Sequence, residues 1–307
     1  MSEFKLNGLD GGNPLAFLAA LGTLRMTTLA YPEKLVRMRW QKNDGGWRPY
    51  LVVEGVLELA EWIATLNTAL RSPNGQPAFG ISRDLNLPCE DFRSIAVDAK
   101  NHATKGDRCF LDFLAAFGSE IVEAQANGKK TGLIADTAFR TMSGAGHQHF
   151  LRFMSELEKL TEADHLRSAL FESWKYEDPG PSMRWDPADD RRYAQRWKEP
   201  SGDPLKTVRG ANRLAIEALP LFPTAAIGNR LETTGFSQRR RSGAVWTWAI
   251  WSTELSLYVV RSLLSLSELQ RIVPNRKILR SIGIEEVYRC QRITQGKYRN
   301  FSQAIPT

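Results

Sequence analysis

The chain has 307 residues, 42% of them hydrophobic, and a formal net charge of +7. This composition excludes a disordered chain, and no apolar run reaches the ~18 residues of a membrane span. The first residues lack the pattern of a signal peptide, and Cys89, Cys109 and Cys290 show no zinc or disulfide spacing, so we expect a cytoplasmic protein.

The first 70 residues predict a buried helix, a hairpin and an amphipathic helix. Asn13 is a suitable N-cap and Pro14 a suitable first residue for a helix that is apolar nearly all round. Gly22 inside this helix predicts a close contact with another helix or strand. The predicted bounds are 14–29 for the helix, 35–40 and 50–54 for the hairpin strands, and 56–70 for the amphipathic helix.

Residues 107–126 predict the next long helix. Four apolar residues recur on one face at helical spacing, and Asn127-Gly128 is expected to end the helix. The segment before it, 72–87, is rich in Pro, Gly, Ser and Asn and predicts a loop.

A glycine-rich segment, SGAGHQHF, precedes another predicted helix. Gly144 and Gly146 lead into its N-terminus, where free backbone N–H groups predict an anion site. His147 and His149 are two residues apart, and no nearby Cys or acid completes a ligand set, which disfavours a metal. Contact with nucleic acid and packing within the loop are both open interpretations for these histidines.

The segment from Ser182 to Phe222 interleaves eight Lys/Arg with six Asp/Glu. Asp186 as N-cap and Pro187 as first residue predict a helix to about Trp197. Two interpretations are open: a surface helix with Asp–Arg pairs, or arginines that bind phosphates. So many arginines disfavour a metal on the aspartates. The candidate nucleic-acid contacts are Arg184, Arg191, Arg192 and Arg196.

Residues 208–219 predict a second, tightly packed helix with a stripe of small apolar residues. Arg209, Asn212 and Arg213 are expected on the opposite face as further candidate contacts. Arg213 also lies four residues before Glu217, so a solvated ion pair is the alternative.

Positive charge is concentrated at the end of the sequence. Residues 230–307 carry 13 basic and 5 acidic side chains, whereas residues 1–150 carry 16 of each. A concentrated basic region predicts a polyanionic partner, most simply nucleic acid. Strands are predicted over 231–236, 245–251 and 287–293 and from residue 298 onward, with a helix over 256–266. The candidate contacts are Arg239, Arg240 and Arg241 at a hairpin tip, where a solvated turn is equally open, and Lys277, Arg280, Arg292, Lys297 and Arg299.

These patterns predict an α+β fold of mixed helices and short antiparallel strands. The N-terminal part is helix-rich, and the C-terminal part is basic, rich in Trp and contains hairpins. The helix-breaking run at 177–181 predicts an N-terminal domain over 1–178 and an arginine-rich C-terminal region over 182–307, with a single domain as the alternative.

Recognisable catalytic motifs are absent from the sequence. It has no Walker-type phosphate loop, zinc pattern or nucleophile elbow, so we expect neither an enzyme nor a cofactor. The nearest alternative is a metal-dependent nuclease that uses Asp91, Asp98 and Lys100, a short pattern that is frequent by chance.

Four segments give the chain a family resemblance: GLDGGNPLAFLAALGTLR, SGAGHQHF, RWDPADDRRYA and RGANRLAIEALPLFP. In these it resembles the smaller large-subunit-type proteins of type I-G (formerly I-U) CRISPR systems. The resemblance implies a non-catalytic subunit of an RNA-guided DNA-surveillance complex in antiviral defence.

The partners that the resemblance implies are guide RNA, target DNA, the backbone subunits of the complex and a helicase-nuclease recruited in trans. The implied role includes recognition of the motif adjacent to the target, while guide pairing reads the remaining sequence. The chain is shorter than the longer signature subunits of the subtype and lacks a recognisable helical bundle at its end. A purely structural subunit whose basic tail serves assembly is a further alternative.

Overall fold

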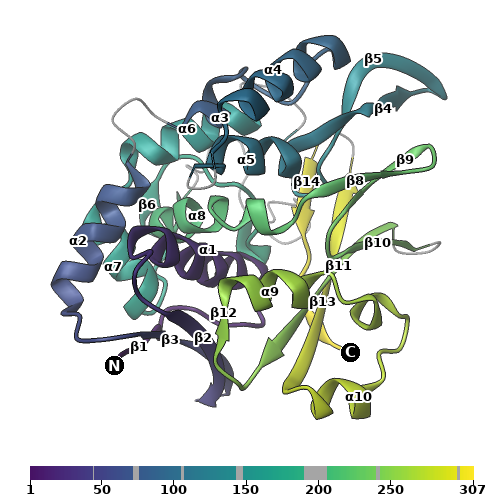
Figure 1. Ribbon diagram of the computed structural model, residues 1–307. Coiled ribbons are helices and arrows are strands. Elements are labelled where there is room, and N and C mark those ends of the chain that lie inside the picture. Colours follow the sequence, from purple (N-terminus) through teal and green to yellow (C-terminus); the bar gives the residue numbers. More distant parts are fainter. Residues whose placement is uncertain are drawn as a thin grey trace, which may run out of the picture.

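The structure, a computed structural model, describes residues 1–43, 45–71, 76–104, 107–142, 148–189, 206–239, 243–295 and 298–307. Its fold is mixed α+β, as the sequence predicts, with helices packed against small antiparallel sheets (Figure 1). The helices are α1 (Pro14–Ala30), α2 (Leu59–Leu70), α3 (Pro77–Gly80), α4 (Cys89–His102), α5 (Cys109–Phe117), α6 (Phe150–Leu160), α7 (Ala163–Phe171), α8 (Arg209–Ile216), α9 (Leu257–Leu264) and α10 (Arg276–Ser281).

The strands form two larger sheets and three separate two-stranded sheets, β4-β5, β6-β7 and β8-β9. One sheet has the order β1-β3-β2-β12; the other has the order β10-β11-β13-β14, with β15 also paired to β13. The strands are β1 (Ser2–Lys5), β2 (Val36–Asn43), β3 (Gly46–Val53), β4 (Gly118–Ala126), β5 (Lys129–Asp136), β6 (Asp178–Pro179), β7 (Lys206–Thr207), β8 (Thr224–Ile227), β9 (Arg230–Thr233), β10 (Phe236–Arg239), β11 (Gly243–Trp251), β12 (Leu255–Ser256), β13 (Ile284–Gln295), β14 (Tyr298–Phe301) and β15 (Ile305–Pro306). Short 3-10 turns are η1 (Pro187–Asp189), η4 (Leu219–Leu221) and η5 (Ser267–Gln270).

Helices α1 and α8 lie side by side at the centre of the molecule (Figure 1). The Asn13 side chain accepts a hydrogen bond from the Ala16 N–H at 3.1 Å and so caps α1, as predicted. Gly22 permits the close approach of the two helices, because a Cβ there would lie 1.8 Å from the Leu214 carbonyl oxygen. Gly210 does the same for α7: its Cβ would lie 2.1 Å from the His165 oxygen.

Aromatic side chains join the N-terminal helix and sheet to the C-terminal sheet. The Phe17 ring of α1 stacks on Trp40 of β2 and Trp248 of β11, with ring centroids 5.8 and 5.5 Å apart. Indole N–H groups complete the connection: Trp248 donates to the Gly11 oxygen and Trp251 to the Met38 oxygen, both at 2.8 Å. The principal hydrophobic core therefore contains residues from both sides of segment 177–181.

The predicted helix over 107–126 is wrong in its second half. The helix α5 ends at Phe117, and residues 118–126 form β4 instead. Asn127 and Gly128 have positive φ angles of 51° and 75°, so they form the turn of the β4–β5 hairpin rather than the end of a helix.

Other predicted elements differ in detail. The strand predicted over 231–236 is broken between β9, which ends at Thr233, and β10, which begins at Phe236. The loop predicted over 72–87 contains the short helix α3. Only the start of the helix predicted after Asp186 lies in the described residues, where it is the 3-10 turn η1. Among the helices that the structure describes, none is both long and apolar enough to cross a membrane.

Candidate nucleic-acid interface

The described residues of the four segments that carry the family resemblance contact one another in the fold. Segments distant in sequence are thus brought together around α1 and α8. The contacts between them are a hydrogen bond of 3.2 Å from Asn13 Nδ2 to Asp186 Oδ1, the approach of Gly22 to Leu214, and an edge-to-face contact of Phe150 with Trp185 at 6.4 Å. Met183, the residue before RWDPADDRRYA, also donates its N–H to Asn212 Oδ1 at 2.8 Å.

Asp186 is buried where these segments meet. Its carboxylate accepts hydrogen bonds from Asn13 Nδ2, from the Ala188 N–H at 2.9 Å and from the Tyr176 hydroxyl at 3.0 Å. Burial raises the pKa of Asp186 above its ordinary value and outweighs these hydrogen bonds, which favour the charged form. The carboxylate at this junction therefore costs folding free energy at neutral pH.

We expect Asp186→Asn to stabilise the fold at pH 7 and to have less effect at pH 4. Because the folded-state pKa is raised, the contribution of Asp186 to stability is complete below its unfolded-state pKa of ~3.9 and is lost as pH rises through the folded-state value. Asparagine removes the buried charge, and its amide still accepts one hydrogen bond and donates another. Thermal melts of both proteins between pH 4 and pH 7 check this; a stabilisation that grows toward pH 4 would contradict it.

The prediction that Asn212 and Arg213 lie on a solvated face of α8 is wrong, because their side chains are buried, and their role in nucleic-acid binding stays a prediction. Arg213 is 2% exposed and Asn212 is fully buried. Arg213 Nη1 pairs with Glu217 Oε1 at 2.7 Å, and its Nη2 donates to the Leu70 oxygen at 2.8 Å. Residues 210–216 of α8 are all buried, so the helix has no solvated face on which these groups could meet a ligand.

Arg209 and Arg184 are half-buried, and the Arg209 guanidinium is partly committed to the protein's own backbone. Arg209 donates to the Pro179 oxygen at 2.6 Å and contacts His165 Nε2 at 2.9 Å. Arg184 has a φ of 57°, and its N–H donates to Ser182 Oγ. The role of these two arginines in binding stays a prediction.

Arg239 lies beside Arg289, and both guanidiniums bind carbonyl groups at the end of η5. Arg239 Nη2 donates to the Arg271 oxygen at 3.2 Å, and Arg289 donates to the oxygens of Arg271 and Ile272 at 2.8 and 3.0 Å. Burial, with a smaller effect of Arg239, lowers the pKa of Arg289 to about 10. Arg239 thus has a structural role that its sequence position did not indicate.

Arg140 is the centre of a second polar cluster, next to the glycine-rich segment. Its guanidinium pairs with Asp136, with Asp84 Oδ2 at 3.1 Å and with Asn86 Oδ1 at 3.0 Å. His149 at the N-cap of α6 places its Nδ1 3.6 Å from Asp84 Oδ2. The charge of Arg140 is therefore neutralised within the protein.

Arg292 contacts this cluster but has no carboxylate partner of its own among the described residues. Its Nη2 donates to the Arg140 carbonyl oxygen at 2.8 Å, and its Nε is buried with no partner in the described part of the chain. Burial, followed by repulsion from Arg299, lowers the pKa of Arg292 to about 10, while Asp136 opposes this. The region thus has a positive charge that its described neighbours do not neutralise.

Arg299 shares one face of the β13–β14 pair with Arg292. Phe301 is paired with Arg292, and Arg299 with Thr294, so all four side chains project to the same face. Phe301 is buried in the aromatic core, whereas Arg299 is half-buried and makes no hydrogen bond or ion pair with any described residue. We call Arg292 and Arg299 the hairpin arginine pair.

The remaining candidates do not join the pair within the described residues. Lys277 and Arg280 are exposed on α10, at a different part of the C-terminal region (Figure 1). Nine predicted residues lie outside the described ranges: Gly144, Gly146, His147, Arg191, Arg192, Arg196, Arg240, Arg241 and Lys297.

The residues proposed for a metal-dependent nuclease lie on α4. Asp91, Asp98 and Lys100 are exposed, and Asp98 Oδ1 lies 3.3 Å from His102 Nδ1. In the described part of the chain, no group of three or more His, Cys, Asp or Glu side chains could hold a metal ion. The nuclease alternative therefore gains no structural support.

No protein-family model matches the chain, and no curated protein matches it either. The assignment of this interface therefore rests on its own geometry and charge. Sequence reasoning missed Arg140 and Asp84, which bind His149 and Arg292 into one cluster; these positions are far apart in the chain and follow no local spacing.

Proposed function

We propose that the chain is a non-catalytic nucleic-acid-binding subunit of a type I CRISPR RNA-guided DNA-surveillance complex. The observation that carries the nucleic-acid part is the hairpin arginine pair: two guanidiniums on one face, with no carboxylate within ion-pair distance in the described residues. A phosphate is the natural partner, because arginine offers it a planar fork of donors and a permanent charge.

Charge distribution supports the same proposal. The pair lies in the region 230–307, where 13 basic side chains face 5 acidic ones. Such a local excess attracts a polyanion over distances of about a Debye length, roughly 8 Å at physiological ionic strength. Nucleic acid is such a polyanion, and its phosphates can be bound by an arginine pair.

Membership of a surveillance complex is the finer part of the proposal and rests on the family resemblance. The described residues of the four segments that carry it lie close to one another around α1 and α8. In this role the subunit binds guide RNA or target DNA and contributes to recognition of the adjacent motif. The backbone subunits and a helicase-nuclease recruited in trans supply the remaining functions.

We expect Arg299→Ala to weaken binding of both single-stranded RNA and duplex DNA by about tenfold. This is the loss in affinity that corresponds to the free energy of one charge-assisted hydrogen bond. The salt dependence should also decrease, by roughly 0.9 in the log–log slope on duplex DNA. The fold should be unchanged because the Arg299 side chain has no hydrogen-bond or ion-pair partner among the described residues. Fluorescence anisotropy with labelled oligonucleotides over a salt series measures both quantities.

Arg261→Ala is the matched control. Arg261 is exposed on α9 and its removal changes the net charge equally. If both variants bind alike, the hairpin arginine pair does not contact nucleic acid, and a purely structural subunit becomes the better proposal.

A further inference from the structure

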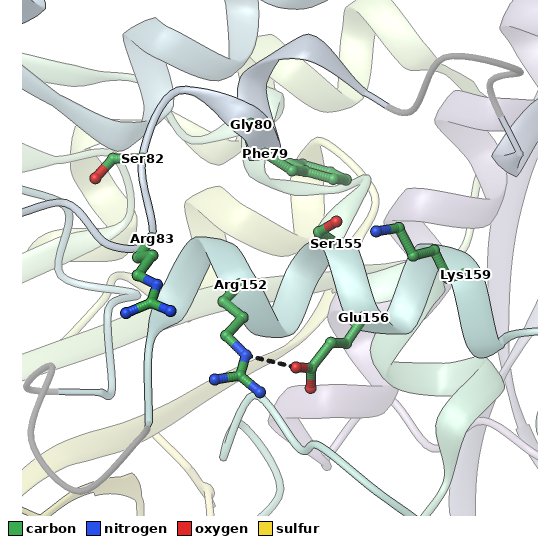
Figure 2. Close-up of a pocket in the computed structure, with 8 residues that line it drawn as sticks. All are labelled: Phe79, Gly80, Ser82, Arg83, Arg152, Ser155, Glu156 and Lys159. Atoms are coloured by element: carbon green, nitrogen blue, oxygen red, sulfur yellow. Dashed lines mark hydrogen bonds and ion pairs between the residues drawn. The ribbon is translucent and has the colours of Figure 1, made fainter.

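A polar pocket lies between α6 and the segment that follows α3, away from the hairpin arginine pair. It has a volume of about 500 Å³ and is open to solvent. Figure 2 shows the side chains around it: Arg83 and Arg152 lie at one end and Lys159 at the other. The lining also includes the hydroxyls of Ser82 and Ser155 and the ring of Phe79.

One helix face builds the longer wall of the pocket. Arg152, Ser155, Glu156 and Lys159 follow the spacing i, i+3, i+4, i+7, so they form a single stripe on α6. The opposite face of α6 is buried in the core. The N–H of Arg152 donates to the Arg83 oxygen at 3.1 Å, which holds the second wall against the start of α6.

The charge inside the pocket is positive and only partly paired. Arg152 Nε pairs with Glu156 Oε1 at 2.6 Å, as the dashed line in Figure 2 marks, and Glu156 is the single acid in the lining. The side chains of Arg83 and Lys159 are exposed and make no hydrogen bond or ion pair with any described residue. Two cationic groups at opposite ends are therefore free to bind a ligand.

This arrangement suits a ligand with phosphates on both sides of a sugar. Arg152 and Lys159 are two helical turns apart, about 10 Å along the α6 axis, so one phosphate cannot easily engage both ends. The Ser155 hydroxyl between them and the Ser82 hydroxyl near Arg83 match sugar and phosphate oxygens (Figure 2). Phe79 is 3% exposed and packs edge-to-face on Phe113 at 5.2 Å, so it lines the pocket without offering a free face to a base.

We propose that this pocket binds the sugar-phosphate backbone of a single strand of nucleic acid, an inference that rests on the proposed function and names a second contact for the same ligand. A volume of this size accommodates about one nucleotide unit, the usual scale of a small-ligand pocket. The pocket is also linked to the Arg140 cluster, since Arg83 borders the pocket and the next residue, Asp84, pairs with Arg140. A strand that contacts both the pocket and the Arg140 cluster crosses the segment between α3 and α4.

The test compares Arg83→Ala/Lys159→Ala with a control of equal charge change, Arg93→Ala/Lys129→Ala, whose residues are exposed on α4 and β5. The probe is a labelled ten-nucleotide oligothymidylate, titrated over a potassium chloride series. We expect the pocket variant to bind at least about tenfold more weakly and to lose about 1.4 from the salt slope, the value for two contacts on a single strand. Equal binding by the two double variants would overturn the proposal.

A third variant acts in the opposite direction. Glu156→Gln removes the acid of the lining and releases Arg152, so it should tighten oligothymidylate binding about two- to fivefold, the scale of an exposed ion pair. Unchanged or weaker binding by this variant would count against the pocket. Circular dichroism melts establish that each variant is folded as the wild type is.

Two further probes separate alternative ligands. Thymidine monophosphate should compete far less well than the oligothymidylate, because it carries phosphate on one side of the sugar only. Equal competition would mean that the ligand of the pocket is a free nucleotide and not a strand. A Glu-rich decapeptide that competes as well as the oligothymidylate would overturn the phosphate assignment. If Arg299→Ala weakens binding and the pocket variant does not, only the inference about the pocket fails. If the pocket variant weakens binding and Arg299→Ala does not, the pocket remains a binding site and the hairpin arginine pair is not one.

Discussion

We expect Glu217→Gln to destabilise the protein by about 3–5 kcal/mol, the cost of leaving a buried charge without its partner. Glu217 bridges Arg25 at 2.6 Å and Arg213 at 2.7 Å, and all three side chains are at most 6% exposed. Glutamine keeps the shape of the side chain but leaves two buried guanidiniums with no carboxylate between them. Urea unfolding followed by circular dichroism measures the change.

Glu254→Gln is the control for this substitution. Glu254 pairs with Arg37 at 3.1 Å, but both side chains are about a third exposed, and such a surface pair contributes about 0–1 kcal/mol. The account requires a much larger loss at Glu217 than at Glu254. Similar losses at the two positions would mean that the buried network does not hold α1 and α8 together.

Gly22→Ala should destabilise the protein by about 3 kcal/mol or more, although alanine is the better helix former by about 1 kcal/mol. The added Cβ would lie 1.8 Å from the Leu214 oxygen, a backbone atom of α8 that cannot rotate aside. The two central helices would have to separate along their contact. Thermal or urea unfolding of the variant gives the size and sign of the effect.

The same substitution at an open glycine is the matched control. A Cβ at Gly80 in α3 meets no atom within 4 Å, so Gly80→Ala should be neutral or slightly stabilising. A stabilised Gly22→Ala protein would contradict the close packing of α1 on α8.

Much of the fold follows from local sequence signals. The Asn13 cap, the Pro14 start and the close contact at Gly22 were all predictable, because capping and small-residue packing act through neighbouring atoms. The strand β4 was not, since its apolar residues also fit a helical spacing. Asn127-Gly128 forms the turn of the β4–β5 hairpin, but this pair suits a helix end as well as a two-residue hairpin turn, so it did not distinguish the strand from a helix.

The candidate site was less accessible to sequence reasoning. Arg213 lies opposite the small-residue stripe of α8, which predicted exposure, but other helices cover that side and Glu217 neutralises its charge. The hairpin arginine pair was predicted only as two members of a basic tail. The pair lacks carboxylate partners because Arg140 forms ion pairs with Asp84 and Asp136. This arrangement is a property of the tertiary structure.

Purification of the tagged chain from its native host, with sequencing of bound RNA and identification of co-purifying proteins, tests the central claim most directly. The account predicts RNAs of one size class with shared terminal sequences, together with several partner proteins. It also predicts less bound RNA with Arg299→Ala than with Arg261→Ala. A wild-type chain that purifies without nucleic acid or partners would contradict the account.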